Sequence, residues 1–401
     1  MKILMLTPYM PYPPSSGGQV RSYNLIKHLS KNHDIHLVAL VKNDEEKQYQ
    51  KQLEKYCSEI HVCKRSESPW TISNIVKSVL GKFPFLVVRN YSAEAEAQVK
   101  KLIATHQFDL IHAETFYIMP HIPHTSIPIF LVEQTIEYKV YQHFVNQISL
   151  PFLRPFFLPD ILKLKYWEKS FWKKADFVGA VSESDEEHMH ELVPGLKTTI
   201  IPNAAGEDLL EIYKPSKQPK PIFLYIGNYS WLQNVEGAQI LIDHIFPLIR
   251  QEIPEATCII AGQRADEKLG IVTSPGVKII DIASSDTDKV IEVFTKGSIF
   301  LAPLEGPGGT RLKILGAMAA GMPVVSSKTG VSGLEVKHGK HAYIAKNYQE
   351  FADYAISLLR DPKKYAAMRT DARALVDDVY SWNGVSQKLE KIYAKLTTKK
   401  S

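Results

Sequence analysis

The stretch from residue 301 to residue 327, LAPLEGPGGTRLKILGAMAAGMPVVSS, constrains the fold more than any other part of the chain. It predicts a buried strand ending at Pro303, a glycine-rich loop, a helix that opens at Thr310, and a second strand after Pro323. Thr310 is a good N-cap and Arg311 adds a cation in the first turn, so exposed amides and the positive helix pole face the loop. This arrangement predicts a phosphate site, with a plain tight turn as the alternative.

Length and composition predict a large enzyme with two domains. With 401 residues, 45% of them hydrophobic, the chain can bury two cores. The net charge is +5, and without a basic recognition motif this charge does not predict nucleic-acid binding. It is equally compatible with an anionic substrate and with an anionic membrane surface. Three cysteines without metal-ligand spacing (Cys57, Cys63 and Cys258) favour packing roles in a reducing cytoplasm. The apolar run at the N-terminus is too short for a signal peptide and predicts a first buried strand.

Strands alternate with helices in two successive sets, which predicts parallel sheets covered by helices on both faces. The first set is expected at residues 2–6, 35–41, 109–112, 128–132 and 177–181, and the second at 222–226, 257–261, 277–280, 298–302 and 323–326. The polar, proline-rich stretch 212–221 is the best linker candidate. We therefore expect an α/β protein with two doubly wound, Rossmann-like domains that face a central cleft, with ligands beyond the carboxyl ends of the strands.

Two segments that follow predicted strands of the first domain carry candidate functional residues. The loop after the first strand ends in Gly17 and Gly18, whose backbone could approach a phosphate or an acceptor, and Arg21 could add charge. The alternative is a long turn shaped by prolines and glycines. His112 ends the strand FDLIHA and could donate a hydrogen bond to a substrate or be a satisfied structural residue. Glu114 could face an acceptor or be solvated.

The segment 301–327 resembles the donor-nucleotide motif of family 4 glycosyltransferases, which are retaining enzymes of the GT-B fold. That family usually carries two glutamates separated by seven residues, the second followed by Ala-Met-Ala-x-Gly-x-Pro-Val-Val. The tail is matched here by Ala317, Met318, Ala319, Gly321, Pro323, Val324 and Val325. The glutamate positions are occupied by Gly308 and Gly316. In the family the second glutamate holds the ribose, so either something packs closely against Gly316 or the ribose is held in another way.

Further similarities to the family cover most of the chain, in the segments PYPPSSGGQVRSYNLIKHLSK, VSESDEEHM, IPNAAGED and FLYIGNYSWLQNVEGA. Many relatives place Arg or Lys in the last of these segments to hold the diphosphate, whereas this chain has Asn228 and Asn234. Arg311 and Lys313 are the expected substitutes, and Arg311 is preferred because it lies nearer the helix start. The base is expected near residues 262–264, where backbone groups could read either UDP or GDP.

The resemblance implies transfer of a sugar from a UDP-sugar or GDP-sugar to a glycan, a lipid-linked acceptor or a small molecule, with retention and without a cofactor. No acidic metal-binding motif is evident, so no metal is expected. His112, near the donor sugar, and Arg311 are the expected catalytic residues, and Arg21 and Glu114 are expected on the acceptor side. The expected donor-binding residues are Gly17, Gly18, Gly227, Asn228, Gly262, Gly308, Gly309, Thr310, Arg311, Leu312 and Lys313.

The expected N-terminal, acceptor-side domain covers residues 1–203 and is completed by a returning C-terminal helix at 383–401. The expected nucleotide-sugar domain covers residues 204–382, with the linker at about 203–221. The returning helix is expected because apolar residues recur at helical spacing in YSWNGVSQKLEKIYAKL and because GT-B relatives return their last helix to the first domain.

Residues 139–174 combine aromatic residues with lysines, and apolar positions recur at helical spacing through Ile161, Leu164, Trp167 and Phe171. Such a segment could seat the protein on anionic lipid near a lipid-linked acceptor, or it could be a core helix with a solvated lysine face. We expect a cytoplasmic protein, peripheral on the inner face of the membrane if the first alternative holds.

A second function class remains open. The glycines at positions 308 and 316 favour a catalytically impaired GT-B subunit that binds a ligand or activates a partner. The retained glycine, arginine and histidine positions favour an enzyme.

Overall fold

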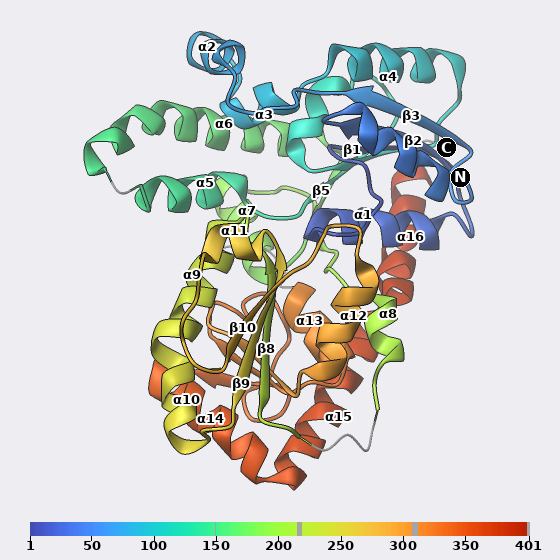
Figure 1. The fold of residues 1–401 in the computed structure, drawn as a ribbon. Helices are drawn as coiled ribbons and strands as arrows, with labels where there is room; N and C mark the ends of the chain where they lie inside the picture. The colour runs from blue at the N-terminus through green and yellow to red at the C-terminus, as the bar shows by residue number, and fades with distance from the viewer. Residues whose placement is uncertain (149, 215–218, 307–311, 399–401) are drawn as a thin grey trace. The chain divides into compact units, whose positions relative to one another are not determined.

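The computed structural model describes residues 1–401 except 149, 215–218, 307–311 and 399–401 (Figure 1). Its internal contacts divide the chain into two compact units, Met1–Pro202 together with the segment that begins at Val385, and Asn203–Gly384. The linker candidate 212–221 falls inside the second unit by this division. The chain around it already packs there, since Arg369 donates a hydrogen bond to the carbonyl of Lys214.

The first unit contains a parallel sheet in the order β3-β2-β1-β4-β5-β6-β7 among the described residues. The strands are β1 (Lys2–Thr7), β2 (Asp34–Val41), β3 (Glu59–Lys64), β4 (Leu110–Glu114), β5 (Ile129–Glu133), β6 (Phe177–Ala180) and β7 (Thr198–Ile200). The strand order reverses between β1 and β4. At such a switch point the connections leave to opposite sides, which opens a crevice beyond the carboxyl ends of the strands.

The helices of the first unit follow its strands along the chain. They are α1 (Gly17–Leu29), α2 (Ile72–Leu80), α3 (Phe85–Asn90), α4 (Ala93–Thr105), α5 (Glu137–Asn146), α6 (Leu158–Lys174), α7 (Glu183–Leu192) and the last helix, α16 (Trp382–Thr398), with 3-10 turns η1 (Asp44–Gln52), η2 (Phe116–His121) and η3 (Pro151–Phe157). In α16, Tyr393 is hydrogen-bonded to His112 of β4 and its ring lies edge-on to the imidazole. Asn32, just after α1, donates to Glu390 of α16 at 2.9 Å. The last helix therefore packs against the start of the chain.

The second unit contains a parallel sheet in the order β10-β9-β8-β11-β12-β13 among the described residues. Its strands are β8 (Ile222–Asn228), β9 (Thr257–Gln263), β10 (Val277–Asp281), β11 (Ile299–Ala302), β12 (Val324–Ser327) and β13 (Tyr343–Ala345). Its helices are α8 (Glu207–Glu211), α9 (Leu232–Ile240), the π-helical turn η4 (Leu241–Ile245), α10 (Phe246–Glu252), α11 (Ala265–Leu269), α12 (Thr287–Lys296), α13 (Leu312–Ala319), α14 (Tyr348–Arg360) and α15 (Pro362–Val379). In Figure 1 the sheet lies between α9 and α10 on one side and α12 and α13 on the other.

The expected fold class, α/β with two doubly wound parallel sheets, is confirmed. The sequence analysis missed β3, β7 and β13, and each of these strands lies at an edge of its sheet. Most of their residues are only half-buried, in contrast to the continuous buried runs of β1 and β4. Because an edge strand needs fewer apolar residues, its hydrophobic pattern is weak.

Candidate functional site

In the second unit, the carboxyl ends of β8 and β9 meet in a very close backbone contact. Gly262 has a φ of +136°, and a Cβ atom added to it would lie 1.8 Å from the carbonyl oxygen of Gly227. Beyond this contact, Asn228 Nδ2 donates to Gln263 Oε1 at 2.8 Å, and Asn228 Oδ1 accepts from the backbone of Ser230 at 2.9 Å. The glycine at position 262 is therefore required by the backbone, and the polar side chains beyond it are held in place.

Lys313 lies in the first turn of helix α13, and its side chain extends to the end of β8. Its Nζ donates to Asn234 Oδ1 at 2.5 Å and lies 4.6 Å from the centre of the Tyr225 ring. Asn234 in turn donates to the carbonyl of Asn228 at 2.7 Å. A Cβ atom on Gly227 would lie 3.1 Å from Lys313 Nζ. The ammonium group of the half-buried Lys313 is thus held at the end of β8.

The switch point of the second sheet lies between β8 and β11, and the loop that follows β11 carries several predicted residues. Gly308, Gly309, Thr310 and Arg311 lie outside the described residues. Leu312 is half-buried and its side chain packs against the apolar core of the unit. Its contribution to an anion site is therefore limited to its backbone amide.

Gly316 occupies one of the two glutamate positions. It lies in α13, and the side chain of Leu209 packs closely against it. A Cβ atom at this position would lie 2.9 Å from Leu209 Cδ1 of α8 and 3.5 Å from Phe294 Cζ of α12. Of the two explanations that the sequence left open, close packing is the one observed. A glutamate here would require the Leu209 side chain to move and would place its carboxylate beside apolar side chains.

In the first unit, three predicted residues form one buried network at the switch point between β1 and β4. Arg21, His112 and Glu114 have no exposed surface. Arg21 Nε lies 3.7 Å from Glu114 Oε2, and His112 Nε2 lies 2.9 Å from Glu114 Oε1. The other imidazole nitrogen of His112 is bonded to the Tyr393 hydroxyl. The charges of Arg21 and Glu114 are therefore paired with each other in the interior of the unit.

The ionisation of Glu114 depends on this network. Burial opposes the charged form, but the hydrogen bond with His112 and the charge of Arg21 outweigh burial and hold the pKa of Glu114 below its ordinary value of 4.5. Gln134 Nε2 adds a further hydrogen bond to Glu114 Oε2 at 2.6 Å. The carboxylate is therefore charged at neutral pH and fully satisfied.

The two predicted glycines of the first unit stand at the start of α1. Gly17 is the first residue of the helix and is exposed. A Cβ atom on Gly18 would lie 2.5 Å from the Tyr9 hydroxyl and 2.8 Å from Gln134 Oε1. Gly18 is thus needed for a close approach of Tyr9 and Gln134, which connect the helix start to the Glu114 network.

Three cations that the sequence analysis did not single out gather near the carboxyl edge of the first sheet. Lys42 directly follows β2, Arg65 directly follows β3, and Arg89 lies in α3. Burial lowers the pKa of Arg65 and the charge of Arg89 lowers it further, although Tyr117 opposes the shift. The buried Nε atoms of both arginines have no hydrogen-bond partner among the described residues. Their place after strand ends is the signal that could have revealed them, and together they can hold an anionic group.

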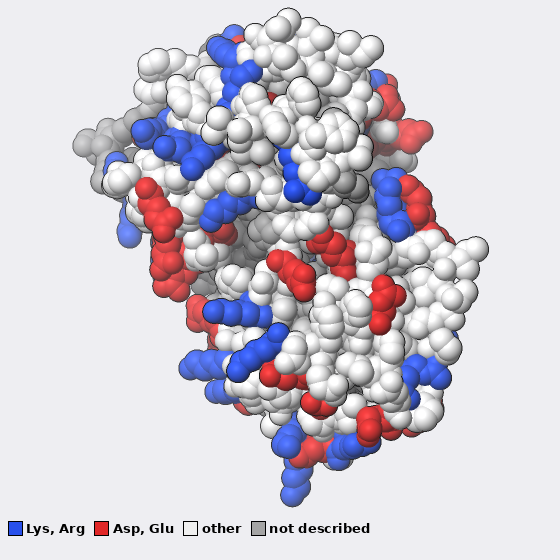
Figure 2. Space-filling view, turned by 90° about the vertical axis from the view of Figure 1, so that its left-hand side faces the viewer, with Lys and Arg blue, Asp and Glu red and all other residues white. Residues whose placement is uncertain are grey.

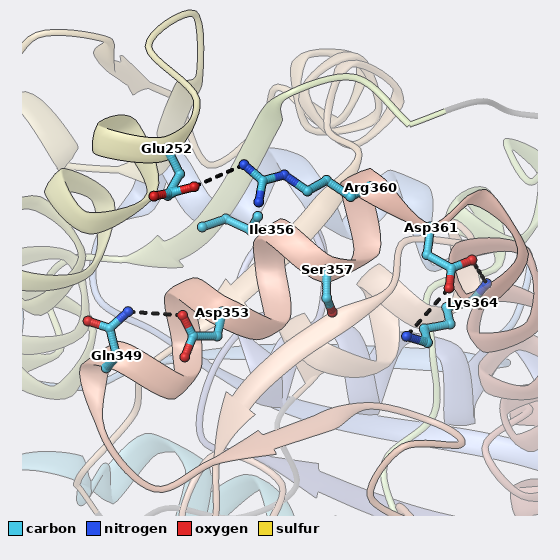
Figure 3. A pocket seen from close by; sticks show the side chains of 8 residues that line it. All are labelled: Glu252, Gln349, Asp353, Ile356, Ser357, Arg360, Asp361 and Lys364. Carbon is cyan, nitrogen blue, oxygen red and sulfur yellow. Dashed lines mark hydrogen bonds and ion pairs between the residues drawn. The ribbon is translucent and has the colours of Figure 1, made fainter.

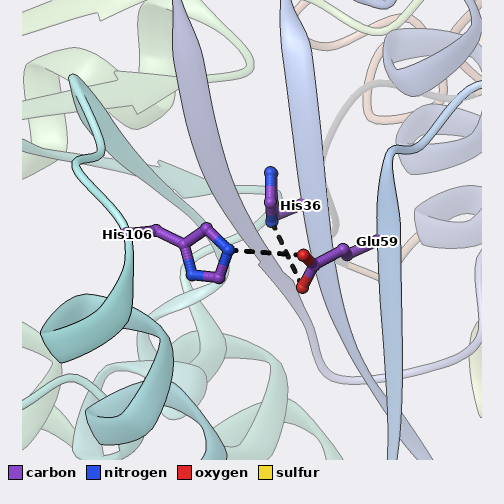
Figure 4. A group of neighbouring side chains, drawn as sticks. All are labelled: His36, Glu59 and His106. Carbon is purple, nitrogen blue, oxygen red and sulfur yellow. Dashed lines mark ion pairs between the residues drawn. The ribbon is translucent and has the colours of Figure 1, made fainter.

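Two further groups of polar side chains, one in each unit, contain ion pairs among their own residues. His36, Glu59 and His106 (Figure 4) lie within metal-binding distance of one another, but Glu59 already pairs with His106 at 3.3 Å and with His61 at 3.1 Å. A polar depression of about 450 Å³ on α14 and α15 (Figure 3) is bordered by the exposed pair Arg360–Glu252 at 3.0 Å. None of the predicted site residues belongs to either cluster.

Two family models match the chain, "Glycosyltransferase Family 4" over residues 15–206 and "Glycosyl transferases group 1" over residues 220–361. An uncharacterized 44.6 kDa protein in the cps region of Klebsiella pneumoniae is 22% identical over 390 residues, which are 94% of this chain and 96% of that protein.

Solved structures share the fold over nearly the whole chain. HepE of Anabaena, in complex with UDP and glucose, has a TM-score of 0.64 at 16% identity and is covered over 100% of its length by 99% of this chain. A mutant of S. aureus TarM, in complex with fondaparinux, alpha-GlcNAc-glycerol and UDP, has a TM-score of 0.66 at 11% identity, with 98% of this chain and 99% of that chain covered.

Gly262→Ala should lower the stability of the second unit by about 3 kcal/mol or more, because it adds both a strained φ and a clash with Gly227. Gly270→Ala is the matched control. Gly270 also has a positive φ, +64°, but its Cβ would meet nothing within 4 Å, so a loss of about 1 kcal/mol is expected. Amide hydrogen exchange in β8 and β9 measures both losses. Equal losses would contradict the close contact.

Arg21→Met should lower the local stability of α1 and β4 at pH 7 by about 3–5 kcal/mol, because it leaves the Glu114 carboxylate buried without its cation. Since the wild-type pKa of Glu114 is depressed, its stabilising contribution is complete above pH 4.5 and is lost as the pH falls through the lower folded value. Hydrogen exchange at several pH values measures both effects, with Lys31→Met as the control at an exposed position. The double variant Arg21→Met/Glu114→Gln should recover part of the loss. If it recovers nothing, the pair is not the cause.

Proposed function

The chain belongs to the family 4 glycosyltransferases and has the GT-B fold, and from this premise we propose that it transfers a sugar from a nucleotide diphosphate to an acceptor. The observation that carries the proposal is the position of Lys313. Its ammonium group is held by Asn234 at the end of β8, next to Gly227, at the switch point of the second sheet. A cation at this place is suited to a diphosphate.

The proposed donor is a UDP-sugar, with a GDP-sugar as the other choice. HepE and TarM, which share the fold, were solved with UDP bound. The diphosphate would lie between Lys313 and the backbone of Gly227 and Asn228, and the base would lie along the ends of β8 and β9. The residues near Gly262 would approach the base with backbone groups.

The proposed chemistry is electrostatic. As the bond between the sugar and the diphosphate breaks, negative charge grows on the leaving oxygen, and Lys313 would stabilise it without reorganisation. Arg311, outside the described residues, would add a second cation. We propose retention of configuration from the family resemblance, and metal independence because the sequence shows no acidic metal-binding motif. The acceptor is a glycan, a lipid-linked sugar or a small molecule.

A specific observation favours the alternative of a catalytically impaired subunit. Gly316 replaces a family glutamate, and its place is taken by the contact with Leu209, so no carboxylate holds the ribose there. Release of UDP from UDP-sugars by the purified protein separates the two functions. Turnover supports the enzyme, whereas UDP binding without turnover, over a panel of UDP-sugars and GDP-sugars, supports the binding subunit.

Lys313→Met should weaken UDP binding by about 10-fold to 100-fold, because it removes a charge-assisted hydrogen bond while keeping the aliphatic stem. Binding of uridine should change little, since uridine has no diphosphate. Isothermal titration with both ligands measures the difference. Lys313→Arg keeps the charge and should retain most of the affinity, and Lys337→Met controls for the loss of one positive charge elsewhere. Equal losses for UDP and uridine would remove Lys313 from the diphosphate site.

His112→Ala should lower kcat by about 100-fold with a much smaller effect on donor affinity, if His112 acts on the reacting sugar. The matched variant is Tyr393→Phe, which removes the hydroxyl partner of Nδ1 and leaves the imidazole in place. Steady-state kinetics and melting temperatures of both variants decide between the roles. A folded His112→Ala protein with normal turnover would make His112 a purely structural residue.

A further inference from the structure

Helix α2 has its polarity reversed relative to an ordinary surface helix. Its buried side chains are the polar Asn74 and Ser78, which are 7% and 5% exposed. Its apolar side chains face solvent, with exposed fractions of 82% for Ile72, 68% for Val79 and 81% for Leu80. The exposed apolar positions follow an i, i+3, i+4, i+7, i+8 pattern, which is normally the pattern of a face that packs on a core.

Polar contacts hold α2 in this orientation. Asn74 Nδ2 donates to Ser66 Oγ and to the carbonyl of Pro69, both at 3.0 Å. Ser78 Oγ donates to Asp160 Oδ1 of α6 at 2.8 Å, and Lys163 Nζ donates to the carbonyls of Ser78 and Gly81 at 2.7 and 2.8 Å. The inward face of α2 is therefore satisfied, and turning the helix over would break these bonds.

Further exposed apolar side chains lie on η3 and on α6, the helix to which α2 is bonded through Ser78 and Asp160. Helix α6 buries Ile161, Leu164 and Phe171 on its inner face, as expected for a core helix. Its outer residues and those of η3 form a second apolar row, made of Phe152, Phe156, Leu158, Leu162 and Tyr166, which are 53–79% exposed. We call the exposed apolar residues of α2, η3 and α6 the outer face. An apolar surface of this extent marks an interaction site.

The charges around the outer face are almost all positive. Lys77 and Lys82 are exposed, and residues 68–93 contain no aspartate or glutamate. Residues 139–174 contain seven lysines and arginines and two acids, Asp160 and Glu168. Both acids are turned inward, Asp160 to Ser78 and Glu168 to the backbone amide of Glu137.

The view in Figure 2 faces the tip of the first unit where η3 joins α5 and α6, and it shows lysine and arginine side chains bordering uncharged surface there. A basic rim around apolar side chains is complementary to an anionic bilayer.

We propose that the outer face docks the first unit on a membrane surface that contains anionic phospholipid, with Ile72, Val79 and Leu80 inserted below the headgroups. A membrane is favoured over a second copy of the chain, because Lys77 and Lys82, on and next to α2, are complementary to anionic headgroups. The docking is peripheral, since none of the described helices combines the length and hydropathy needed to cross a bilayer. The surface reaches beyond the segment 139–174 that the sequence suggested, and its most exposed side chains belong to α2.

The test is co-sedimentation of the full-length protein with vesicles of phosphatidylcholine alone and of phosphatidylcholine with phosphatidylglycerol. Wild-type protein should bind the mixed vesicles and not the neutral ones. The variant Ile72→Ser/Val79→Ser/Leu80→Ser should bind them at least about tenfold more weakly, because it removes the inserted apolar area. Ile271→Ser, at a residue 96% exposed in the second unit, is the matched control and should bind normally.

The charge contribution is tested with Lys77→Gln/Lys82→Gln, which should bind mixed vesicles more weakly and with a smaller dependence on salt. Titration of UDP in solution with each variant reports the donor site separately, so loss of vesicle binding with normal UDP affinity supports the docking surface. Wild-type protein that ignores mixed vesicles, or that binds neutral vesicles equally well, would overturn the proposal. A dimer in solution that the triple variant dissociates would also overturn it, in favour of a second copy.

Discussion

Parallel strand pairing is the constraint on which both candidate regions depend. Every strand pair among the described residues of both sheets is parallel, so the carboxyl ends of the strands gather at one edge. The reversals between β1 and β4 and between β8 and β11 then decide which strand ends are neighbours. Glu114 ends β4 and Asn228 ends β8, so each polar group stands at a switch point because of topology and not because of its local sequence.

The two switch points differ in how their charges are satisfied. In the first unit a cation and an anion, Arg21 and Glu114, lie buried together with His112, and their main effect is on stability and orientation. In the second unit the cation Lys313 is held by a neutral amide, Asn234, and by the face of the Tyr225 ring. These partners orient the ammonium group beside the end of β8, a place that is suited to an anion.

Strong local patterns made the fold and its family predictable. The buried strands, the glycine positions and the motif around Ala317–Val325 lie in short segments, so their meaning does not depend on distant parts of the chain. The edge strands β3, β7 and β13 were not predicted, because few of their residues are buried. The orientation of helix α2 was not predicted, because its amphipathic pattern does not show which face is turned inward. The bonds of Asn74 to Ser66 and Pro69, and of Ser78 to Asp160 in α6, decide that the apolar face is the outer one.

The sequence by itself determined the fold class and most of the positions that stand beyond strand ends, because these follow from hydrophobic periodicity and turn chemistry within short windows. It indicated the family through the resemblance of its motifs. Tertiary structure alone decided the partners of each charged group. The sequence cannot show that Glu114 pairs with Arg21, that His112 meets Tyr393 from the last helix, or that Leu209 covers Gly316. Each of these contacts joins residues about 90 to 280 positions apart, and their distance in space is set by the packing of whole elements rather than by any local preference.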